Sequence, residues 1–126
     1  MSPLLNMLSK YWWLASLMML AAITVFSLIP LESLPEVPGS DKTHHLVSYA
    51  LAILPIALRK PRYWYLFAFA IAAWSGGIEL VQPFVNRYGE WLDLLANVAG
   101  VIIGCVIGVI VNKILITSEN ERVAEY

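Results

Sequence analysis

Four long apolar runs occupy most of this 126-residue chain and leave little polar sequence between them. Soluble domains carry about 25% charged residues, whereas this chain has 13% charged and 60% hydrophobic residues. So large an apolar fraction would overfill a soluble core, so we predict that lipid is the solvent. We predict an all-α fold, a polytopic membrane bundle of four transmembrane helices that form a single domain over residues 1–126. The runs lie at about 11–29, 41–58, 63–81 and 91–112, and the tail at 113–126 is predicted to be mobile.

Two of these runs need comment at their ends. The run at 11–29 is long enough to span a bilayer and is followed by no Ala-x-Ala-like site, so it is interpreted as a retained helix rather than a cleaved signal peptide. The apolar part of the second run, Thr43–Leu58, would reach only about 24 Å as a helix, against a hydrocarbon core of about 30 Å. Starting this helix at Asp41 supplies the missing turn. That start places His45 at membrane or headgroup depth.

The basic residues predict an orientation. In a bundle of four spans they gather on one side, which the positive-inside rule makes cytoplasmic. We therefore expect an inner (cytoplasmic) membrane protein with both termini in the cytoplasm. The net charge of −1 argues against a nucleic-acid partner. The basic residues concerned are Lys10, Arg59, Lys60, Arg62 and Lys113.

Polar residues recur where three of the predicted helices meet the outer face. Asp41, His45 and Tyr49 are spaced i, i+4, i+8 and share one helix face. Because the second helix starts, the third ends and the fourth starts at the outer face, residues far apart in sequence are expected at similar depth. The predicted ligand-binding set is Asp41, Lys42, His45, Tyr49, Glu79, Gln82, Arg87, Asp93 and Asn97.

Each of these residues also has a purely structural interpretation. Glu79 could be a snorkelling surface carboxylate, and Asp93 could simply stabilise a helix N-terminus. Lys42 and Arg87 could either neutralise carboxylates in an ion-pair network or hold an anionic headgroup. On the fourth helix the same stripe continues as small residues that suit close packing, within this chain or with a partner. Those helix-packing residues are Gly100, Gly104 and Gly108.

Metal and acyl-transfer chemistry find little support. His44 is adjacent to His45 but about 100° away on a helix, so the two do not form a chelating pair. Neither an HExxH pattern nor paired Cys/His spacing is present, and the single Cys105 lies inside an apolar run. We predict no metal and no cofactor. If the protein is an enzyme, the candidate catalytic residues are Glu79, Asp93 and His45.

The ordered motifs resemble the VanZ-like family of small bacterial membrane proteins. The resemblance covers about residues 30–108, and no single motif in it is specific on its own. Its namesake accompanies glycopeptide-antibiotic resistance and confers low-level teicoplanin resistance, whereas most members lie outside resistance clusters. The resemblance implies a cell-envelope protein, with glycopeptide susceptibility as an associated property. The motifs are Asp41-Lys42-x-x-His45-x-x-x-Tyr49, Glu79-x-x-Gln82, Arg87 and Asp93-x-x-x-Asn97-x-x-Gly100.

Three functions are compatible with these residues. The first is binding of a membrane lipid or lipid-linked glycan through an anionic headgroup at the outer polar cluster. The second is a membrane enzyme that modifies a lipid or envelope precursor with a carboxylate and a histidine as acid and base. The third is a structural or transport component of a homo-oligomer joined through the glycine stripe.

Overall fold

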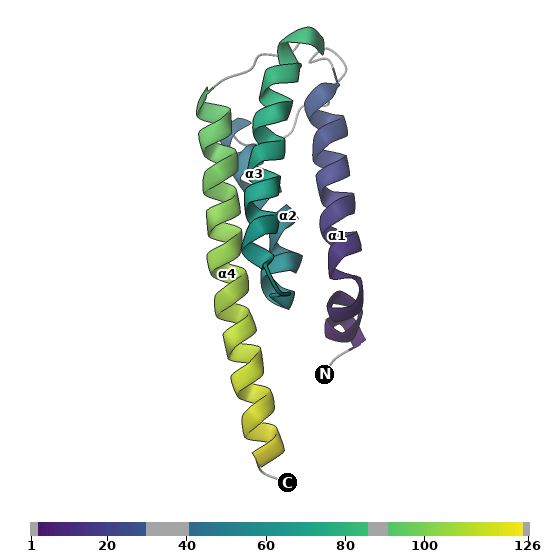
Figure 1. Ribbon diagram of the computed structural model, residues 1–126, viewed down its shortest axis with the longest axis vertical. Coiled ribbons are helices and arrows are strands. Elements are labelled where there is room, and N and C mark those ends of the chain that lie inside the picture. The colour runs from purple at the N-terminus through teal and green to yellow at the C-terminus, as the bar shows by residue number, and fades with distance from the viewer. Residues whose placement is uncertain (1–2, 30–40, 86–90, 125–126) are drawn as a thin grey trace.

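The computed structural model describes residues 3–29, 41–85 and 91–124, and this part of the chain is helical with no strand (Figure 1). The predicted all-α class is confirmed. The helices are α1 (Pro3–Leu28), α2 (Asp41–Arg59), α3 (Trp64–Val81) and α4 (Trp91–Ala124), with a short 3-10 helix η2 (Gln82–Val85) after α3. They run up, down, up and down, so α2 and α4 begin at the end of the bundle where α1 and α3 finish.

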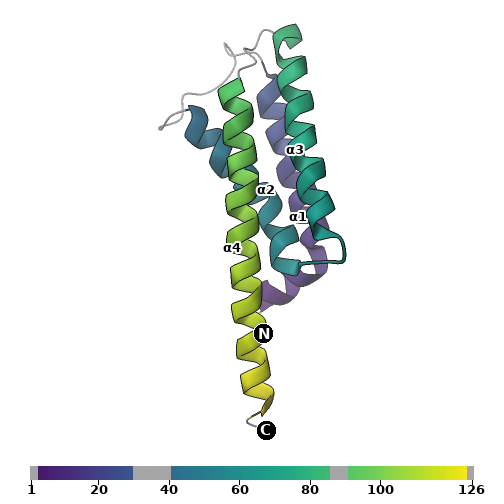
Figure 2. The same ribbon diagram turned by 60° about the vertical axis from the view of Figure 1, so that its left-hand side comes forward.

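The first and last helices, α1 and α4, are longer than the sequence pattern predicts. α1 begins at Pro3, a residue favoured in the first turn because it needs no backbone donor. A non-helical backbone at Tyr11 (φ −112°, ψ 24°) kinks it at the start of the apolar run. α4 continues to Ala124 and extends beyond the other helices in both views (Figures 1 and 2). No Gly or Pro follows Gly108, and most of the tail after residue 112 continues the helix, while its mobility stays a prediction.

Three helices are long and apolar enough to cross a membrane: Lys10–Leu28, Trp64–Val85 and Trp91–Ser118. The helix α2, which the sequence also marks as a span, is not among them. With 19 residues it would be about 28 Å long, but its first turns carry lysine and histidine and its last residue is Arg59. Its position explains how such a helix is accommodated, because the other three helices surround much of it.

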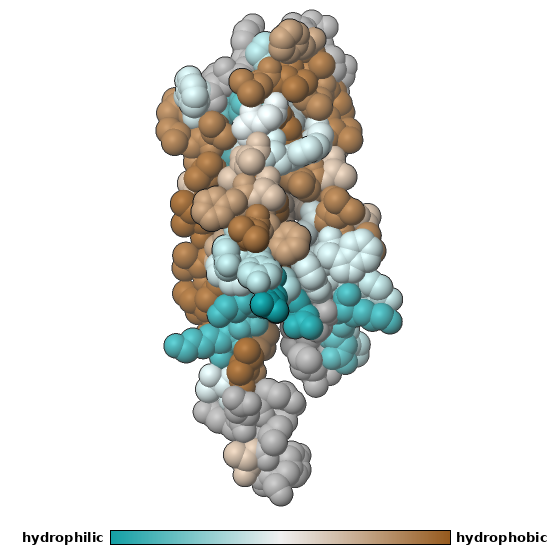
Figure 3. All heavy atoms as spheres, in the orientation of Figure 1, coloured by the Kyte–Doolittle hydropathy of each residue, from teal (hydrophilic) through white to brown (hydrophobic). Residues whose placement is uncertain are grey.

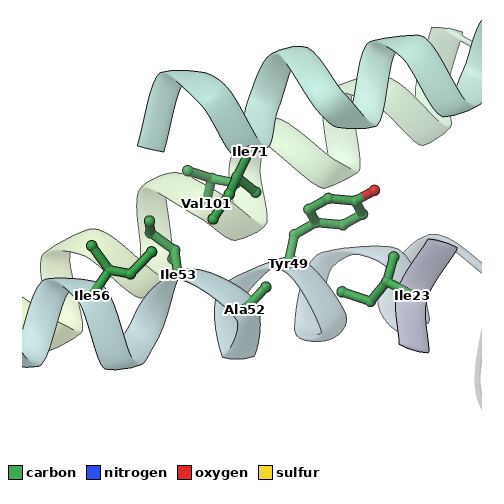
Figure 4. Close-up of a cluster of buried hydrophobic side chains, with 7 residues drawn as sticks. All are labelled: Ile23, Tyr49, Ala52, Ile53, Ile56, Ile71 and Val101. Carbon is green, nitrogen blue, oxygen red and sulfur yellow. The ribbon is translucent and has the colours of Figure 1, made fainter. Parts of the chain in front are cut away.

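The core is centred on α2. Ala52, Ile53 and Ala57 on this helix have no exposed surface. Figure 4 shows α2 side chains facing residues of the other three helices, including Ile23 of α1 and Val101 of α4. Large apolar side chains cover the outside of the bundle, which is predominantly brown in Figure 3. Most of the buried core residues thus belong to α2, although its Val47 and Leu51 are exposed, and the many exposed hydrophobic residues of α1, α3 and α4 form the surface for lipid.

Glycines let α2 and α4 approach at backbone distance. A Cβ at Gly100 would collide with the carbonyl oxygen of Leu46 on α2. A Cβ at Gly104 would lie 2.5 Å from the carbonyl oxygen of Ala50, and one at Gly108 would collide with the side chain of Ala57. The glycine stripe of α4 therefore packs against α2 of the same chain. Such close approach suits helix association in lipid, where van der Waals packing drives assembly.

Polar contacts bracket this glycine stripe. At one end Lys42 of α2 pairs with Asp93 of α4. At the other end Asn112 Nδ2 of α4 donates to the carbonyl oxygen of Leu58, 2.7 Å away. This carbonyl belongs to the last turn of α2, where carbonyls lack an intrahelical partner. The contact between α2 and α4 is therefore closed by glycines along its length and by hydrogen bonds at both ends.

Candidate functional site at the end where α2 and α4 begin

The first turns of α2 and α4 lie at the same end of the bundle, at the top of Figure 1, where α3 and η2 end. Asp93 stands in the first turn of α4, and Lys42 and His45 in the first two turns of α2. Four polar side chains from these turns meet. We call Lys42, His45, Asp93 and Asn97 the polar tetrad.

Asp93 is the centre of the polar tetrad. Its side chain is 6% exposed, and Oδ1 lies 2.5 Å from Lys42 Nζ. Oδ2 lies 3.8 Å from His45 Nε2, at ion-pair distance when the imidazole is protonated. A buried carboxylate costs several kcal/mol unless cationic or donor groups compensate it. Lys42 supplies that compensation from a position that is still 38% exposed.

The orientation of the His45 ring is set by Asn97. His45 Nδ1 lies 2.8 Å from Asn97 Oδ1, and because this oxygen can only accept, Nδ1 carries the proton. Asn97 itself is 1% exposed. With Nδ1 held by Asn97, Nε2 is directed toward Asp93. Both ring nitrogens therefore face groups of the protein.

Tyr49 and Glu79 lie next to the polar tetrad, toward the core. Tyr49 follows His45 by one turn on α2 and is 1% exposed, and its ring packs in the hydrophobic cluster of Figure 4. Oε1 of Glu79 on α3 is shielded from solvent. This carboxylate oxygen is thus enclosed by the protein, and its part in the site stays a prediction.

Gln82 links the end of α3 to α1. Its side chain is 1% exposed, and Nε2 donates to the backbone carbonyl of Ser27 on α1, 3.1 Å away. Its Oε1 is buried and accepts no hydrogen bond from the described residues. Gln82 thereby brings α1 into the site and presents an unsatisfied acceptor.

Two predicted site residues lie partly or wholly outside the described residues. The backbone of Asp41 begins α2, but its side chain lies outside the described residues, as does the whole of Arg87. Their predicted roles therefore remain predictions.

One buried polar residue at this level has no counterpart in the sequence-based set. Ser75 of α3 has no exposed surface, and its hydroxyl donates to the Ala72 carbonyl at 2.7 Å. It precedes Glu79 by one turn, and Gln82 follows three residues later. This i, i+4, i+7 spacing places all three on one helix face and was the signal that could have revealed it.

The side chains gathered at this end of the bundle are suited to binding a polar ligand. Within the described ranges no three His, Cys, Asp or Glu side chains form a set that could hold a metal ion. What the site offers is a partly exposed ammonium, an imidazole, shielded carboxylate oxygens and a buried amide oxygen. Such a mixture can bind a ligand that carries both an anionic group and hydroxyl or amide donors.

Comparison with known proteins identifies the family. The family model described as VanZ/LLP1 matches residues 4–112. The chain belongs to the VanZ/LLP1 family. No curated protein and no solved structure gives a significant match. The match confirms the resemblance found in the sequence and extends it to α1, and together with the three apolar helices it makes the chain a VanZ-like membrane protein.

Proposed function

We propose that this VanZ-like protein binds the anionic headgroup of an envelope lipid or lipid-linked glycan at the outer end of its bundle. The observation that carries the proposal is the polar tetrad, in which a partly exposed Lys42 is held by a buried Asp93 beside His45. A polar cluster at the end of a membrane bundle meets the headgroup layer, where phosphates and sugar hydroxyls are found.

The orientation in this proposal rests on charge. The opposite end of the bundle carries most of the basic residues near helix ends, namely Lys10, Arg59, Lys60, Arg62 and Lys113, whereas Lys42 and Arg87 are exceptions at the other end. Figure 3 shows a hydrophilic (teal) band low on the bundle. The positive-inside rule assigns that end to the cytoplasm of the inner membrane, with both ends of this chain on the cytoplasmic side. The polar tetrad then faces outward.

The electrostatics favour an anion next to Lys42. The N-termini of α2 and α4 both face this end, and each contributes partial positive charge through its helix dipole. Lys42 can turn from Asp93 toward an incoming phosphate because 38% of its side chain is exposed. Protonated His45 would then compensate Asp93 in its place. Arg87, between η2 and α4 in sequence, would supply a bidentate contact.

The buried amide adds selectivity for a polar headgroup over a bare phosphate. Gln82 Oε1 needs a donor, and a sugar hydroxyl or an amide of a lipid-linked glycan can provide one. An acid–base role for the polar tetrad is less well supported, because both nitrogens of His45 face Asn97 and Asp93. An oligomer built on the glycine stripe is also disfavoured, since α2 of the same chain packs there.

A binding experiment tests the proposal. The purified protein in phosphatidylcholine nanodiscs is titrated with a polyprenyl phosphate and with a polyprenyl-diphosphate-linked disaccharide, and bound species are counted by native mass spectrometry. We expect saturable binding that Lys42→Gln weakens about ten-fold, since one charge-assisted contact is lost. Lys113→Gln removes the same charge at the other end of the bundle and should leave binding unchanged.

Equal binding in the wild type and Lys42→Gln would contradict an anion site at the polar tetrad. Arg87→Lys provides a second arm, because it keeps the charge but removes the planar fork. If this variant binds as tightly as the wild type, Arg87 is not a bidentate ligand. In cells, the family association leads us to expect that overexpression raises teicoplanin tolerance and that Lys42→Gln does not.

A further inference from the structure

A second feature lies between α1 and α3, toward the opposite end from the polar tetrad. A groove of about 370 Å³ runs between these helices, a volume in the range of small-molecule sites. Aromatic and aliphatic side chains form its wall, and the aromatic ones include Trp12, Phe67 and Trp74. Trp74 and Leu17 are about half exposed, so the groove opens on the surface that faces lipid.

The lining of this groove is almost wholly apolar and includes one serine, Ser16. Ser16 is 5% exposed, and its Oγ has no hydrogen-bond partner among the described residues. A hydroxyl buried among apolar groups without an acceptor is unfavourable. An acceptor inside the groove would remove that cost. The ligand should therefore carry a carbonyl or similar oxygen at the depth of Ser16.

Cations stand at the nearer end of the groove. Lys10 lies in α1 two residues before Trp12, and Arg62 lies in the turn that leads into α3, five residues before Phe67. Both side chains are exposed and lie against aromatic rings, Lys10 over Tyr11 at 5.3 Å and Arg62 over Tyr63 at 4.9 Å. Both residues are thus close in sequence to side chains that line the groove.

We propose that the groove between α1 and α3 is a binding site for one anionic phospholipid. Its phosphate contacts Lys10 and Arg62, an ester carbonyl accepts a hydrogen bond from Ser16, and one acyl chain lies along the aromatic wall. Along α1, Lys10 precedes Ser16 by six residues and lies on the other side of the kink at Tyr11. That order of anion, acceptor and apolar chain matches a phospholipid. This site shares no residue with the polar tetrad.

Tryptophan fluorescence reports on the groove directly, since three of the five tryptophans line it. The protein is reconstituted in phosphatidylcholine vesicles that contain increasing fractions of phosphatidylglycerol with brominated acyl chains, which quench nearby indoles. We expect quenching that saturates at a low mole fraction of brominated phosphatidylglycerol. Brominated phosphatidylcholine at the same fractions should quench weakly and without saturation.

Charge-matched variants identify the site. Lys10→Gln with Arg62→Gln should shift half-maximal quenching about ten-fold toward higher phosphatidylglycerol. Lys60→Gln with Lys113→Gln removes the same charge from residues outside the groove and should leave the curve in place. Ser16→Ala should shift it about three-fold, the effect of one hydrogen bond in a membrane protein.

Filling the groove gives an independent check. Ala70 lines the groove and is exposed, so Ala70→Phe occupies the space without disturbing the core. Saturable quenching should be lost while the helical circular dichroism signal is retained. The proposal is wrong if the two brominated lipids quench alike, which would indicate only annular lipid. It is also wrong if both double variants shift the curve equally.

Discussion

The α2–α4 and α1–α3 interfaces are built from different side chains and differ in how completely they close. Between α2 and α4, glycines bring the backbones together and hydrogen bonds hold both ends. Between α1 and α3, large aromatic rings meet edge to face, as Trp12 and Phe67 do at 5.8 Å, and a groove remains beside them. Small residues close a membrane interface, whereas bulky residues leave space that lipid can enter.

The two interfaces also differ in what they support. The tightly packed pair positions the polar tetrad, because α2 and α4 carry all four of its side chains. In the loosely packed pair, Trp74 Nε1 of α3 donates a hydrogen bond to Thr24 Oγ1 of α1 at 2.8 Å, on an exposed part of the surface. Disturbing the first interface should therefore cost more stability than disturbing the second.

The largest effect is expected at the centre of the α2–α4 interface. Gly104→Ala forces a Cβ against the backbone of Ala50 and the side chain of Ile53, so the helices must separate. We expect a loss of about 3 kcal/mol in the free energy of unfolding, measured by SDS titration in mixed micelles. Gly77→Ala is the matched control, because no atom lies within 4 Å of its Cβ position, and it should stay within about 0.5 kcal/mol. A similar loss in both variants would contradict the close contact.

The next largest effect is expected at the polar tetrad. Asp93→Ala leaves Lys42 and His45 without their shared carboxylate, and we expect a loss of about 2 kcal/mol in the same titration. The value is below that of a fully buried pair because Lys42 is partly exposed. Lys42→Met should cost less, since His45 still faces Asp93. If the double variant simply adds the two losses, Lys42 and Asp93 are not coupled.

A smaller effect is expected at the far end of the same interface. Asn112→Leu removes the donor to the Leu58 carbonyl in the last turn of α2. We expect a loss of about 1 kcal/mol, the ordinary value of one hydrogen bond, because the carbonyl stays buried without a partner. Thr117→Val removes a hydroxyl that bonds only within α4, at Lys113, and serves as the control. A loss no greater in Asn112→Leu than in this control would show that the hydrogen bond to Leu58 does not stabilise the interface.

The smallest effect is expected between α1 and α3. Thr24→Val removes the acceptor of the Trp74 indole on an exposed part of the surface. We expect about 0.6 kcal/mol, a typical interhelical hydrogen bond in a membrane protein. The Trp74 emission should also change, since its N–H loses a partner. A loss as large as that of Asp93→Ala would mean that the two interfaces are equally important.

The sequence by itself determined the all-α class, the four helices and the family, because long apolar runs, interrupted by proline and polar residues, allow few other folds in lipid. Helical spacing also assigned Asp93, Asn97 and the glycine stripe to one face of α4. Periodicity says which residues share a face, but it does not say which face of another helix they meet.

Only the tertiary structure decided those partners. Rotation and tilt of the packed helices pair Asp93 with Lys42, direct Gln82 to α1, and place α2 of the same chain on the glycines of α4. The groove between α1 and α3 is likewise a product of packing, since no local pattern marks where bulky side chains from two helices fail to fill space. Local sequence chemistry determines which segments form helices, whereas the contacts between helices depend on how all of them pack together.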